Sequence, residues 1–244
     1  MISFGLIGYP LGHSFSKIYF EKKFKLENIK NTEYLNLENS SLEELFSSKK
    51  LLTLEGFNVT IPHKEAIIPY LDELSKEAKA IGAVNCVKRK GQKFIGYNTD
   101  YIGFLNSFKK VKKSYHKKAL ILGNGGATKA IIYALNVLEL DYQIVSRGSS
   151  FDYTDIDKKC LEEYQIIINC TPLGTHPDTD KYPLIPYQFL TDKHFLYDLV
   201  YNPLESRFLS FGKEKKCTIK NGKEMLEIQA DESWFIWNRK NYTY

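Results

Sequence analysis

The sequence predicts an α/β fold, and two junctions between a strand and a helix support this prediction. In the second half of the chain, the buried strand Ala119–Leu122 runs into a glycine-rich turn and then into an apolar helix. In the first half, Gly56–Ile61 alternates as a strand does, stops at Pro62 and resumes as a helix from His63. The chain has 244 residues, of which 43% are hydrophobic and 14% aromatic, so it can form one large domain or two small ones.

The glycine-rich turn has the composition of a phosphate-binding turn. Gly123 permits a tight turn, and Gly125 lets ligand oxygens approach the backbone. The helix that follows offers its first N–H groups and the positive end of its dipole, so the expected ligand is a pyrophosphate. The third position of the dinucleotide-binding pattern, usually Gly or Ala, is Thr128. The alternative is an ordinary turn between a strand and a helix.

The end of the next strand indicates which dinucleotide would bind. Tyr142–Val145 is followed by Ser146 and Arg147, where a dinucleotide-binding fold places the residue that contacts the adenosine ribose. A carboxylate there would favour NAD, whereas Arg147 can pair with the 2′-phosphate of NADP through two charge-assisted bonds. NADP is therefore favoured. The alternative is a solvated surface arginine, and the nearby Asp152 weakens the preference.

Charge and cysteine content exclude several classes of function. Much of the net charge of +5 comes from lysines between Lys109 and Lys118, which predict a solvated face. We expect no nucleic-acid partner, since the sequence shows neither a basic patch interleaved with stacking aromatics nor a known nucleic-acid-binding module. The four cysteines and five histidines are scattered, which predicts reduced structural thiols and no metal site. The sequence has neither a signal-peptide pattern nor an apolar run long enough to cross a bilayer. We therefore expect a cytoplasmic protein without a membrane partner.

Two serines precede the first predicted helix. Ile2–Ile7 is predicted to be a strand, and a turn connects it to the helix Lys17–Phe24. The hydroxyls of Ser14 and Ser16, together with N–H groups at the helix start, can hold a carboxylate without a matching charge. The alternative is that one of these serines is simply the N-cap of the helix.

Polar side chains gather where the strand before Pro62 ends. Asn58, Thr60 and Lys64 lie at this corner, and ligands bind at the carboxyl ends of parallel strands. Lys64 can donate to a substrate oxygen, and the alternative is an exposed helix lysine. Two elements are predicted upstream of this corner. Tyr34–Leu37, which includes Leu35, is a short strand, and Leu42–Phe46 is a helix.

A predicted hairpin carries two further polar residues. We expect a helix over Leu71–Ile81, followed by strands within Gly82–Val87 and Phe94–Asp100. The hairpin places Asn85 and Asp100 at its ends. Asp100 also opens a predicted helix, so it can be an N-cap carboxylate, a ligand for a substrate hydroxyl, or both.

Taken together, these motifs resemble those of the shikimate dehydrogenase family, in the family's order and over most of the chain. Three positions depart from the family pattern: the segment Ser146–Gly148 keeps only the arginine of Asn-Arg-Thr, Lys17 replaces a proline, and Cys86 replaces a threonine. The motifs that carry the resemblance are Gly8–Ser16, Asn58–Lys64, Gly82–Asn85, Asn98–Phe104, Gly123–Ala127, Ile168–Gly174, Asp198–Pro203, Gly222, Met225–Leu226 and Gln229–Ala230.

The resemblance implies an enzyme of two domains. It implies reversible, NADPH-dependent reduction of 3-dehydroshikimate to shikimate, in chorismate and aromatic amino acid biosynthesis, by a monomer or homodimer. An α/β substrate-binding domain would comprise residues 1–101, completed by a C-terminal helix at 223–244, and a Rossmann-type NADP-binding domain would comprise residues 102–222. Trp234 and Trp237 make this last helix strongly apolar, so we expect it to return to the first domain's core. The alternatives are an NAD-using quinate/shikimate dehydrogenase and a non-catalytic module that binds a cofactor or metabolite.

The resemblance also implies a role for each matched residue. Lys64 and Asp100 would be the catalytic pair, with Lys64 protonating the alkoxide left by hydride transfer and Asp100 orienting the hydroxyl. The residues expected to bind substrate are Ser14, Ser16, Asn58, Thr60, Asn85, Tyr201 and Gln229. The residues expected to bind NADP(H) are Gly123, Asn124, Gly125, Gly126, Ala127, Ser146, Arg147, Leu199 and Gly222.

Overall fold

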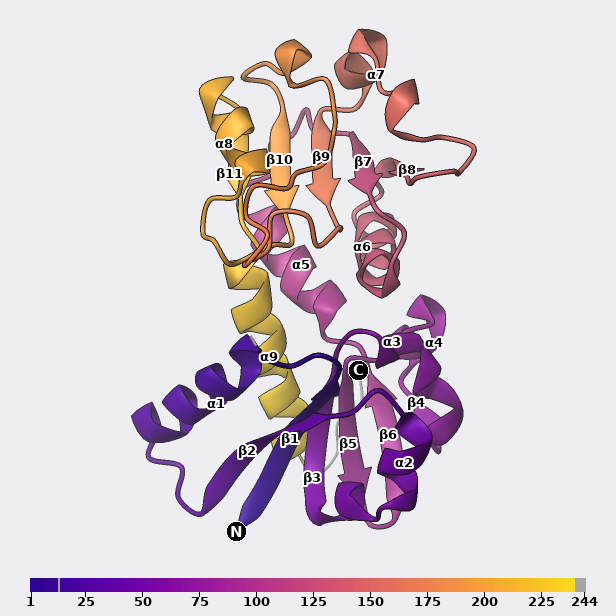
Figure 1. Ribbon diagram of the computed structural model, residues 1–244, viewed down its shortest axis with the longest axis vertical. Helices are drawn as coiled ribbons and strands as arrows, with labels where there is room; N and C mark the ends of the chain where they lie inside the picture. The colour runs from indigo at the N-terminus through magenta and orange to yellow at the C-terminus, as the bar shows by residue number, and fades with distance from the viewer. Residues whose placement is uncertain (13, 240–244) are drawn as a thin grey trace. The chain divides into compact units, whose positions relative to one another are not determined.

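The chain forms two compact units, each with its own sheet (Figure 1). The structure is a computed structural model that describes residues 1–12 and 14–239. The first unit comprises residues 1–99 and the segment from Gln229, and the second comprises Asp100–Ile228. His13 of the opening motif and residues 240–244 of the expected C-terminal helix lie outside the described residues. The predicted α/β class is confirmed.

The first unit is a mixed six-stranded sheet with helices on both faces. In chain order its elements are β1 (Ile2–Gly8), α1 (Phe15–Leu26), β2 (Thr32–Glu38), α2 (Leu42–Ser47), η1 (Lys50–Thr53), β3 (Leu54–Val59), α3 (His63–Ala66), η2 (Ile68–Tyr70), β4 (Glu73–Leu74), α4 (Lys76–Ile81), β5 (Cys86–Lys90), β6 (Lys93–Tyr97) and the second part of α9 (Lys223–Asn238). The strand order is β2-β1-β3-β5-β6-β4.

The strand directions bring several chain segments to one edge of this sheet. β1 and β3 are parallel, so their carboxyl ends, Gly8 and Val59, lie at the same edge. β5 runs antiparallel to β3 and starts at this edge, where Cys86 lies opposite Asn58. β6 is antiparallel to β5 and ends there, with Tyr97 opposite Cys86. The residues after β1, β3 and β6, and those before β5, therefore share one edge.

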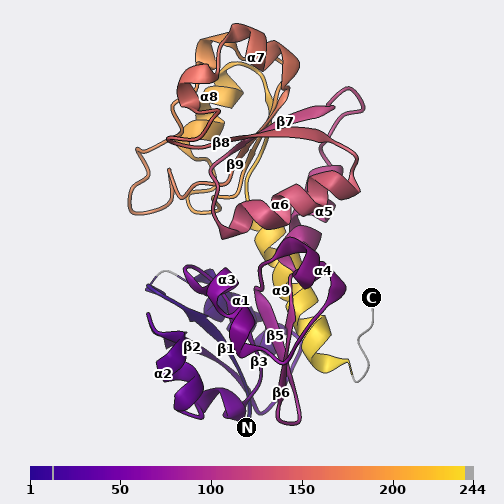
Figure 2. The same ribbon diagram turned by 90° about the vertical axis from the view of Figure 1, so that its right-hand side faces the viewer.

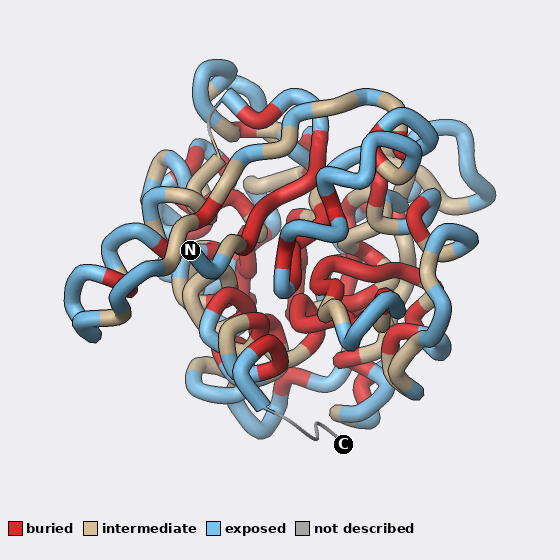
Figure 3. The backbone as a smooth tube through the Cα atoms, turned by 90° about the horizontal axis from the view of Figure 1, so that it is seen from below, coloured by how far each residue is buried: buried red, intermediate tan, exposed pale blue. Residues whose placement is uncertain are grey.

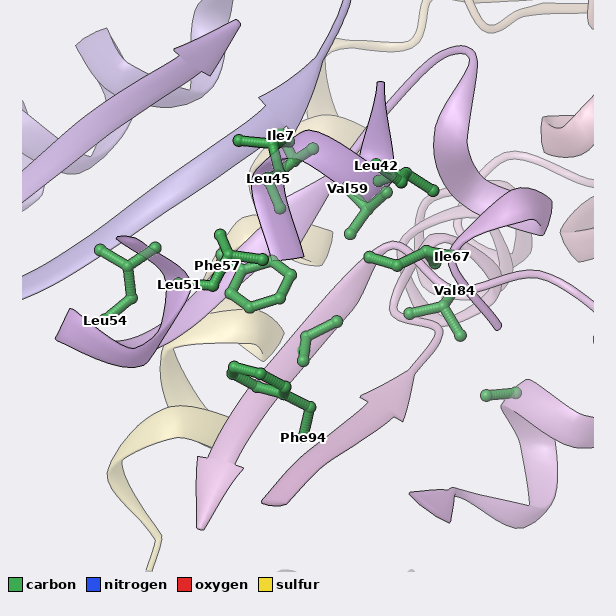
Figure 4. Close-up of a cluster of buried hydrophobic side chains, with 12 residues drawn as sticks. Ile7, Leu42, Leu45, Leu51, Leu54, Phe57, Val59, Ile67, Val84 and Phe94 are labelled. Carbon is green, nitrogen blue, oxygen red and sulfur yellow. The ribbon is translucent and has the colours of Figure 1, made fainter. Parts of the chain in front are cut away.

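One face of this sheet packs against α2 (Figure 4). Leu42 and Leu45 of α2 belong to the same buried cluster as Phe57 and Val59 of β3. Phe57 and Val59 are two residues apart, so they point to the same face of the strand, and Asn58 between them points to the other. This alternation is what leaves a polar side chain of β3 on the face opposite the cluster.

The opposite face packs against α1 and α9. The ring of Trp237 stacks on Phe4 at 4.8 Å between centroids, and its Nε1 donates to the carbonyl of Val87 at 3.0 Å. Trp234 packs against Phe24 at 5.3 Å. A Cβ on Gly56 would lie 2.3 Å from Cδ1 of Trp237, so only glycine leaves room for this ring. The expected return of the C-terminal helix to the first domain is confirmed.

The predicted helix over Leu71–Ile81 is wrong in its first half. Helix α4 begins at Lys76, and Glu73–Leu74 form β4, which pairs with β6. The backbone N–H of Asp72 donates to the carbonyl of Phe94 at 3.0 Å, and its carboxylate accepts from the N–H of Phe94 at 2.7 Å. Pairing with the sheet thus overrides the local helical pattern.

The second unit is a five-stranded parallel sheet. Its elements are α5 (Asp100–Lys109), β7 (Lys118–Leu122), α6 (Gly126–Val137), β8 (Asp141–Val145), η3 (Tyr153–Asp155), α7 (Lys158–Glu163), β9 (Ile166–Asn169), η4 (Tyr187–Phe189), β10 (Phe195–Asp198), α8 (Arg207–Glu214), β11 (Thr218–Lys220) and the start of α9. The order β11-β10-β9-β7-β8 changes direction at β7, because the chain passes first to β8 on one side and then to β9 on the other. Dinucleotides bind beside such a switch point, and the predicted Rossmann-type arrangement is confirmed.

The sheet of the second unit has helices on both sides: α5 and α6 lie on one side, and α7 and α8 on the other (Figure 2). Phe195 and Tyr197 point to the face of α5, where Phe108 stacks on Phe195 at 5.2 Å and Phe104 contacts Tyr197 at 4.9 Å. Leu196 points to the other face and joins the cluster that α7 and α8 cover. In Figure 3 the buried residues lie toward the inside and the exposed residues in the outer turns of the chain.

All four cysteines are free thiols. Burial raises the pKa of Cys86 and Cys170 to about 12 and that of Cys160 and Cys217 to about 11, so the thiols stay protonated and unreactive. Within residues 1–12 and 14–239, no helix combines the length and the apolarity needed to cross a bilayer.

Candidate functional site

Predicted site residues of the first unit lie at the shared edge of its sheet. Thr60 directly follows β3, Asn85 directly precedes β5, and Lys64 lies in α3. The N–H of Val84 donates to the carbonyl of Lys64 at 2.7 Å, and the N–H of Val59 donates to the carbonyl of Asn85 at 2.9 Å. These backbone hydrogen bonds hold the Lys64 and Asn85 segments beside the end of β3.

The two predicted carboxylate-binding serines differ in their contacts. Ser14 occupies the N-cap position of α1, yet within the described part of the chain its side chain makes no capping hydrogen bond. Ser16, in the first turn, lies near the buried phenol of Tyr34 and lowers its pKa, against the larger rise that burial causes. Both serines are half-buried. Ser14 is therefore the N-cap residue by position, as the capping alternative expects, but its hydroxyl does not cap the described helix.

A buried polar network joins three predicted substrate-binding residues. Asn58, Asn85 and Gln229 are 5%, 2% and 7% exposed, and Thr99 and Ser233 beside them are fully buried. Asn58 Nδ2 donates to the carbonyl of Asn85 at 3.1 Å, and Asn85 Nδ2 donates to Gln229 Oε1 at 3.2 Å. The fold thus brings together residues from β3, the start of β5 and α9.

Sequence reasoning missed three members of this network. Tyr34 Oη donates to Asn58 Oδ1 at 2.8 Å, Thr99 Oγ1 accepts from Asn85 Nδ2 at 2.9 Å, and Ser233 Oγ accepts from Asn58 Nδ2 at 2.8 Å. The only sequence signal for Ser233 is its place one helical turn after Gln229 on α9, which puts both residues on one face.

The predicted catalytic residues belong to different units. Lys64 is half-buried in α3 of the first unit. Asp100 is the first residue of α5 in the second unit and is 6% exposed. It follows Thr99 in the chain, whose backbone N–H donates to Asn85 Oδ1 at 2.6 Å. Acidic residues are favoured in the first turn of a helix, and Asp100 occupies such a position.

The glycine-rich turn of the second unit is open where a ligand would approach. Gly123 has a φ of +105°, which favours glycine, and a Cβ on it would lie 2.9 Å from the side chain of Thr171. Gly125, the N-cap of α6, has an ordinary φ of −96°, and a Cβ there would meet nothing within 4 Å. The open space and the N–H groups that start α6 fit a pyrophosphate. Asn124 is exposed, whereas Gly126 and Ala127 begin the helix.

Thr128 replaces the third small residue of the dinucleotide pattern without disturbing the turn. It is fully buried, and its hydroxyl donates to the carbonyl of Gly123 at 3.0 Å. Its backbone N–H donates to the carbonyl of Gly125 at 2.9 Å. The threonine therefore closes the turn with a hydrogen bond that Gly or Ala could not make.

Arg147 is exposed in a tight turn after β8. The hydroxyl of Ser149 donates to the carbonyl of Ser146 at 2.9 Å, and Gly148 has a φ of +71°. The guanidinium lies near Tyr153, where its charge opposes the rise that burial causes in the phenol's pKa. The hydrogen-bonded turn after β8 thus leaves Arg147 exposed to solvent, where it is accessible to a phosphate.

The strand end of β10 carries the other predicted cofactor and substrate residues. A Cβ on Gly222 would lie 2.1 Å from the carbonyl oxygen of Leu199, so glycine is required for these segments to meet. The N–H of Gly222 donates to the carbonyl of Val200 at 3.0 Å. Tyr201, the residue after Val200, is half-buried.

Asp198, the last residue of β10, organises this strand end. Its carboxylate accepts hydrogen bonds from Asn169 Nδ2 at 2.9 Å, from the N–H of Val200 at 3.0 Å and from the hydroxyl of Ser206. Burial nevertheless raises the pKa of Asp198 to about 6, and these three hydrogen bonds oppose the rise. The carboxylate thus holds the segment that carries Leu199 and Tyr201.

The raised pKa of Asp198 predicts a specific pH dependence of stability. An unfolded aspartate has a pKa of about 3.9, so the folded state binds this proton more tightly than the unfolded state does. As pH rises through about 6, the free energy of unfolding therefore decreases by about 3 kcal/mol. Asp198→Asn stays neutral, so its melting temperature relative to the wild type should increase between pH 4 and pH 7. Thermal unfolding of both proteins at several pH values measures this difference.

Asp152→Asn is the matched control for that experiment. Hydrogen bonds from Thr154 lower the pKa of the exposed Asp152, so its stabilising effect is lost as pH falls. Because this loss occurs below the unfolded pKa of about 3.9, the melting temperature of Asp152→Asn relative to the wild type should stay nearly constant between pH 4 and pH 7. A pH-independent difference for Asp198→Asn would contradict the raised pKa.

Comparisons with known proteins show which family this chain resembles. A family model described as the shikimate dehydrogenase substrate binding domain matches residues 6–87. The shikimate dehydrogenase (NADP(+)) of Syntrophomonas wolfei is 41% identical over 249 residues, covering 93% of this chain and 86% of that protein. The crystal structure of shikimate dehydrogenase from Aquifex aeolicus aligns with a TM-score of 0.88 and 33% identity, covering 98% of this chain and 92% of that one.

A further solved structure contains both ligands expected from the resemblance. The shikimate 5-dehydrogenase of Thermus thermophilus, in complex with NADP(H) and shikimate, aligns with a TM-score of 0.85 and 29% identity, covering 98% of this chain and 94% of that one. The similarities extend over both units. This chain belongs to the shikimate dehydrogenase family.

Proposed function

We propose that this chain is an NADP-dependent shikimate dehydrogenase, which reversibly reduces 3-dehydroshikimate to shikimate. The observation that carries the proposal is 41% identity, over 93% of the chain, to a shikimate dehydrogenase (NADP(+)). The residues that the reaction needs are also present, at motif positions in both units. The pathway that contains this reaction is chorismate and aromatic amino acid biosynthesis.

The substrate is an anion with several hydroxyl groups, and the proposed binding residues match both features. Ser14, Ser16 and Tyr201 supply hydroxyls for the carboxylate, which needs donors but no matching charge. Thr60 and the buried amides bind the ring hydroxyls by hydrogen bonds, and buried polar groups of this kind discriminate strongly against ligands that lack a partner. Asn58, Asn85 and Gln229 are these amides.

The proposed chemistry is a hydride transfer coupled to a proton transfer. When bound, the nicotinamide supplies the hydride to the carbonyl carbon of the substrate. The electron pair of the carbonyl π bond moves to oxygen, and the ammonium of Lys64 gives that oxygen a proton. The carboxylate of Asp100 accepts a hydrogen bond from the hydroxyl and orients it. In the reverse direction Lys64 takes the proton back.

The second unit suits NADP(H) by the chemistry of its residues. The open turn at Gly125 and the start of α6 fit the pyrophosphate, and Arg147 pairs with the 2′-phosphate. Ser146, Leu199 and Gly222 complete the proposed binding surface. On this proposal residues 1–101 with 223–244 bind substrate and residues 102–222 bind cofactor. We also propose a cytoplasmic monomer or homodimer without a nucleic-acid or membrane partner.

Replacing Lys64 tests the proposed reaction. Lys64→Met keeps the length of the side chain but removes the proton donor, so kcat for shikimate oxidation should fall by roughly 10²- to 10⁴-fold. The KM for NADP should not change. NADPH absorbance measures the rate, and Lys76→Met, an exposed lysine at the start of α4, is the control that should retain activity.

The same assay decides between the alternatives. Activity with quinate and NAD, but not with shikimate and NADP, would replace the proposal with a quinate/shikimate dehydrogenase that uses NAD. A folded wild type that oxidises neither substrate with either cofactor would leave the non-catalytic binding module.

Replacing Arg147 tests the preference for NADP. Hydrogen bonds to charged groups contribute about 1.5–3 kcal/mol, so Arg147→Ala should raise the KM for NADP roughly 10- to 150-fold. The KM for NAD should stay the same, because NAD has no 2′-phosphate. Steady-state kinetics with both cofactors measure the two values. An equal increase for NAD would assign Arg147 to another part of the cofactor.

Replacing Gly125 tests the phosphate-binding turn. The backbone at Gly125 is ordinary and the space around it is open, so Gly125→Ala should leave the melting temperature unchanged. The added methyl group would occupy the ligand's space, and a steric conflict of about 1–3 kcal/mol would weaken NADP binding roughly 5- to 150-fold. Titration calorimetry measures the affinity. Gly12→Ala, with equally open space in the other unit, should bind NADP like the wild type.

A further inference from the structure

In the buried network of the first unit, backbone atoms determine which side-chain amide atoms donate hydrogen bonds and which accept them. The backbone N–H of Thr99 lies 2.6 Å from Asn85 Oδ1. A backbone N–H can only donate, so the facing atom of Asn85 must be the amide oxygen. The other end of this amide is therefore the nitrogen, which donates to Thr99 Oγ1 at 2.9 Å and to Gln229 at 3.2 Å.

The same argument orients the side-chain amide of Gln229. Because Asn85 Nδ2 can only donate, the atom of Gln229 that faces it must be the acceptor Oε1. The hydroxyl of Thr99 also donates to this oxygen, at 3.4 Å. The nitrogen end of the Gln229 amide is consequently directed away from Asn85, and an amide nitrogen offers only donors.

Asn58 is oriented by a second backbone atom. Its Nδ2 lies 3.1 Å from the carbonyl of Asn85, which can only accept, and 2.8 Å from Ser233 Oγ. Both N–H groups are thus used inside the protein. Its Oδ1 accepts from Tyr34 Oη at 2.8 Å, and burial raises the pKa of Tyr34 well above its usual value, so this phenol stays a donor.

Ser233 connects Asn58 to the helical turn that carries Gln229. Its hydroxyl accepts from Asn58 Nδ2 and donates to the carbonyl of Gln229 at 2.9 Å. Thr99 Oγ1 lies 3.3 Å from the same hydroxyl. Ser233 is fully buried. The hydroxyl of Ser233, which belongs to α9, thus contacts Asn58 of β3 and Thr99, which follows β6.

We propose that Ser233 is a positioning residue for substrate binding: through Asn58, Thr99 and the turn of Gln229, it holds the Gln229 amide with its N–H donors toward the substrate. The inference rests on the proposed function, because it assumes that Gln229 contacts the ring hydroxyls. It predicts that Gln229 meets a lone pair of a substrate oxygen. Ser233 itself need not touch the substrate.

Ser233→Ala tests the proposal, with Ser107→Ala as a matched control. Ser107 is also fully buried in a helix, and its hydroxyl donates to the carbonyl of Gly103, four residues earlier, at 2.7 Å. Both variants lose the same kind of hydrogen bond, but Ser107 lies in the second unit. Ser233→Ala should raise the KM for shikimate roughly tenfold, with the KM for NADP and kcat within about twofold of the wild type. Ser107→Ala should leave the KM for shikimate unchanged.

Substrate analogues separate positioning from a general loss of stability. If Gln229 contacts a ring hydroxyl, 4-deoxy- or 5-deoxyshikimate should bind the wild type more weakly than shikimate does. In Ser233→Ala this difference should shrink for one of the two analogues, because the amide is no longer held. Equal differences in both proteins, or a KM for shikimate that Ser233→Ala leaves unchanged, would overturn the proposal.

A measurement without turnover keeps this proposal distinct from the proposed function. In ¹H–¹⁵N spectra, the side-chain amide signals of Asn58 and Gln229 should shift and exchange faster with water in Ser233→Ala, but not in Ser107→Ala. Unchanged amide signals in Ser233→Ala would overturn the positioning role. A wild type that shows these amide signals but does not oxidise shikimate would overturn the proposed function alone.

Discussion

Both units depend on the constraint that parallel strands end at the same edge of a sheet. In the first unit this brings together the segments after β1 and β3, and antiparallel β5 and β6 add Asn85 and Thr99 to that edge. In the second unit β7, β8, β9 and β10 all end where the glycine-rich turn, Arg147 and Asp198 lie. Residues far apart in the chain thus become neighbours without any contact that is specific to the ligand.

Close backbone approach is the second requirement, and two glycines meet it. Gly56 leaves space in β3 for the ring of Trp237, which attaches α9 to the first sheet. Gly222 lets the chain before α9 approach the carbonyl of Leu199 at the end of β10. Both positions are occupied so tightly that one methyl group would displace a ring or a peptide. The start and the end of α9 are therefore each attached through a glycine.

The polar groups buried at the two strand edges are satisfied in different ways. In the first unit neutral amides and hydroxyls bond one another, which avoids the cost of burying charge. In the second unit Asp198 is a buried carboxylate with three donors, and its pKa rises to about 6 because those donors do not fully replace water. The first arrangement gives an orientation that is independent of pH, whereas the second makes the β10 end sensitive to pH.

The sequence by itself determined the α/β class and the two strand-to-helix corners, and it predicted the site residues that local patterns mark, such as Gly123, Lys64 and Arg147. These features depend on hydrophobic periodicity and turn chemistry, which act over a few residues. Only the tertiary structure decided that residues 71–75 leave the helix, because Asp72 pairs with Phe94. It also decided that Ser233 meets Asn58 across 175 positions of the chain, which no local pattern records because the hydrogen bond forms only once α9 packs on the first sheet.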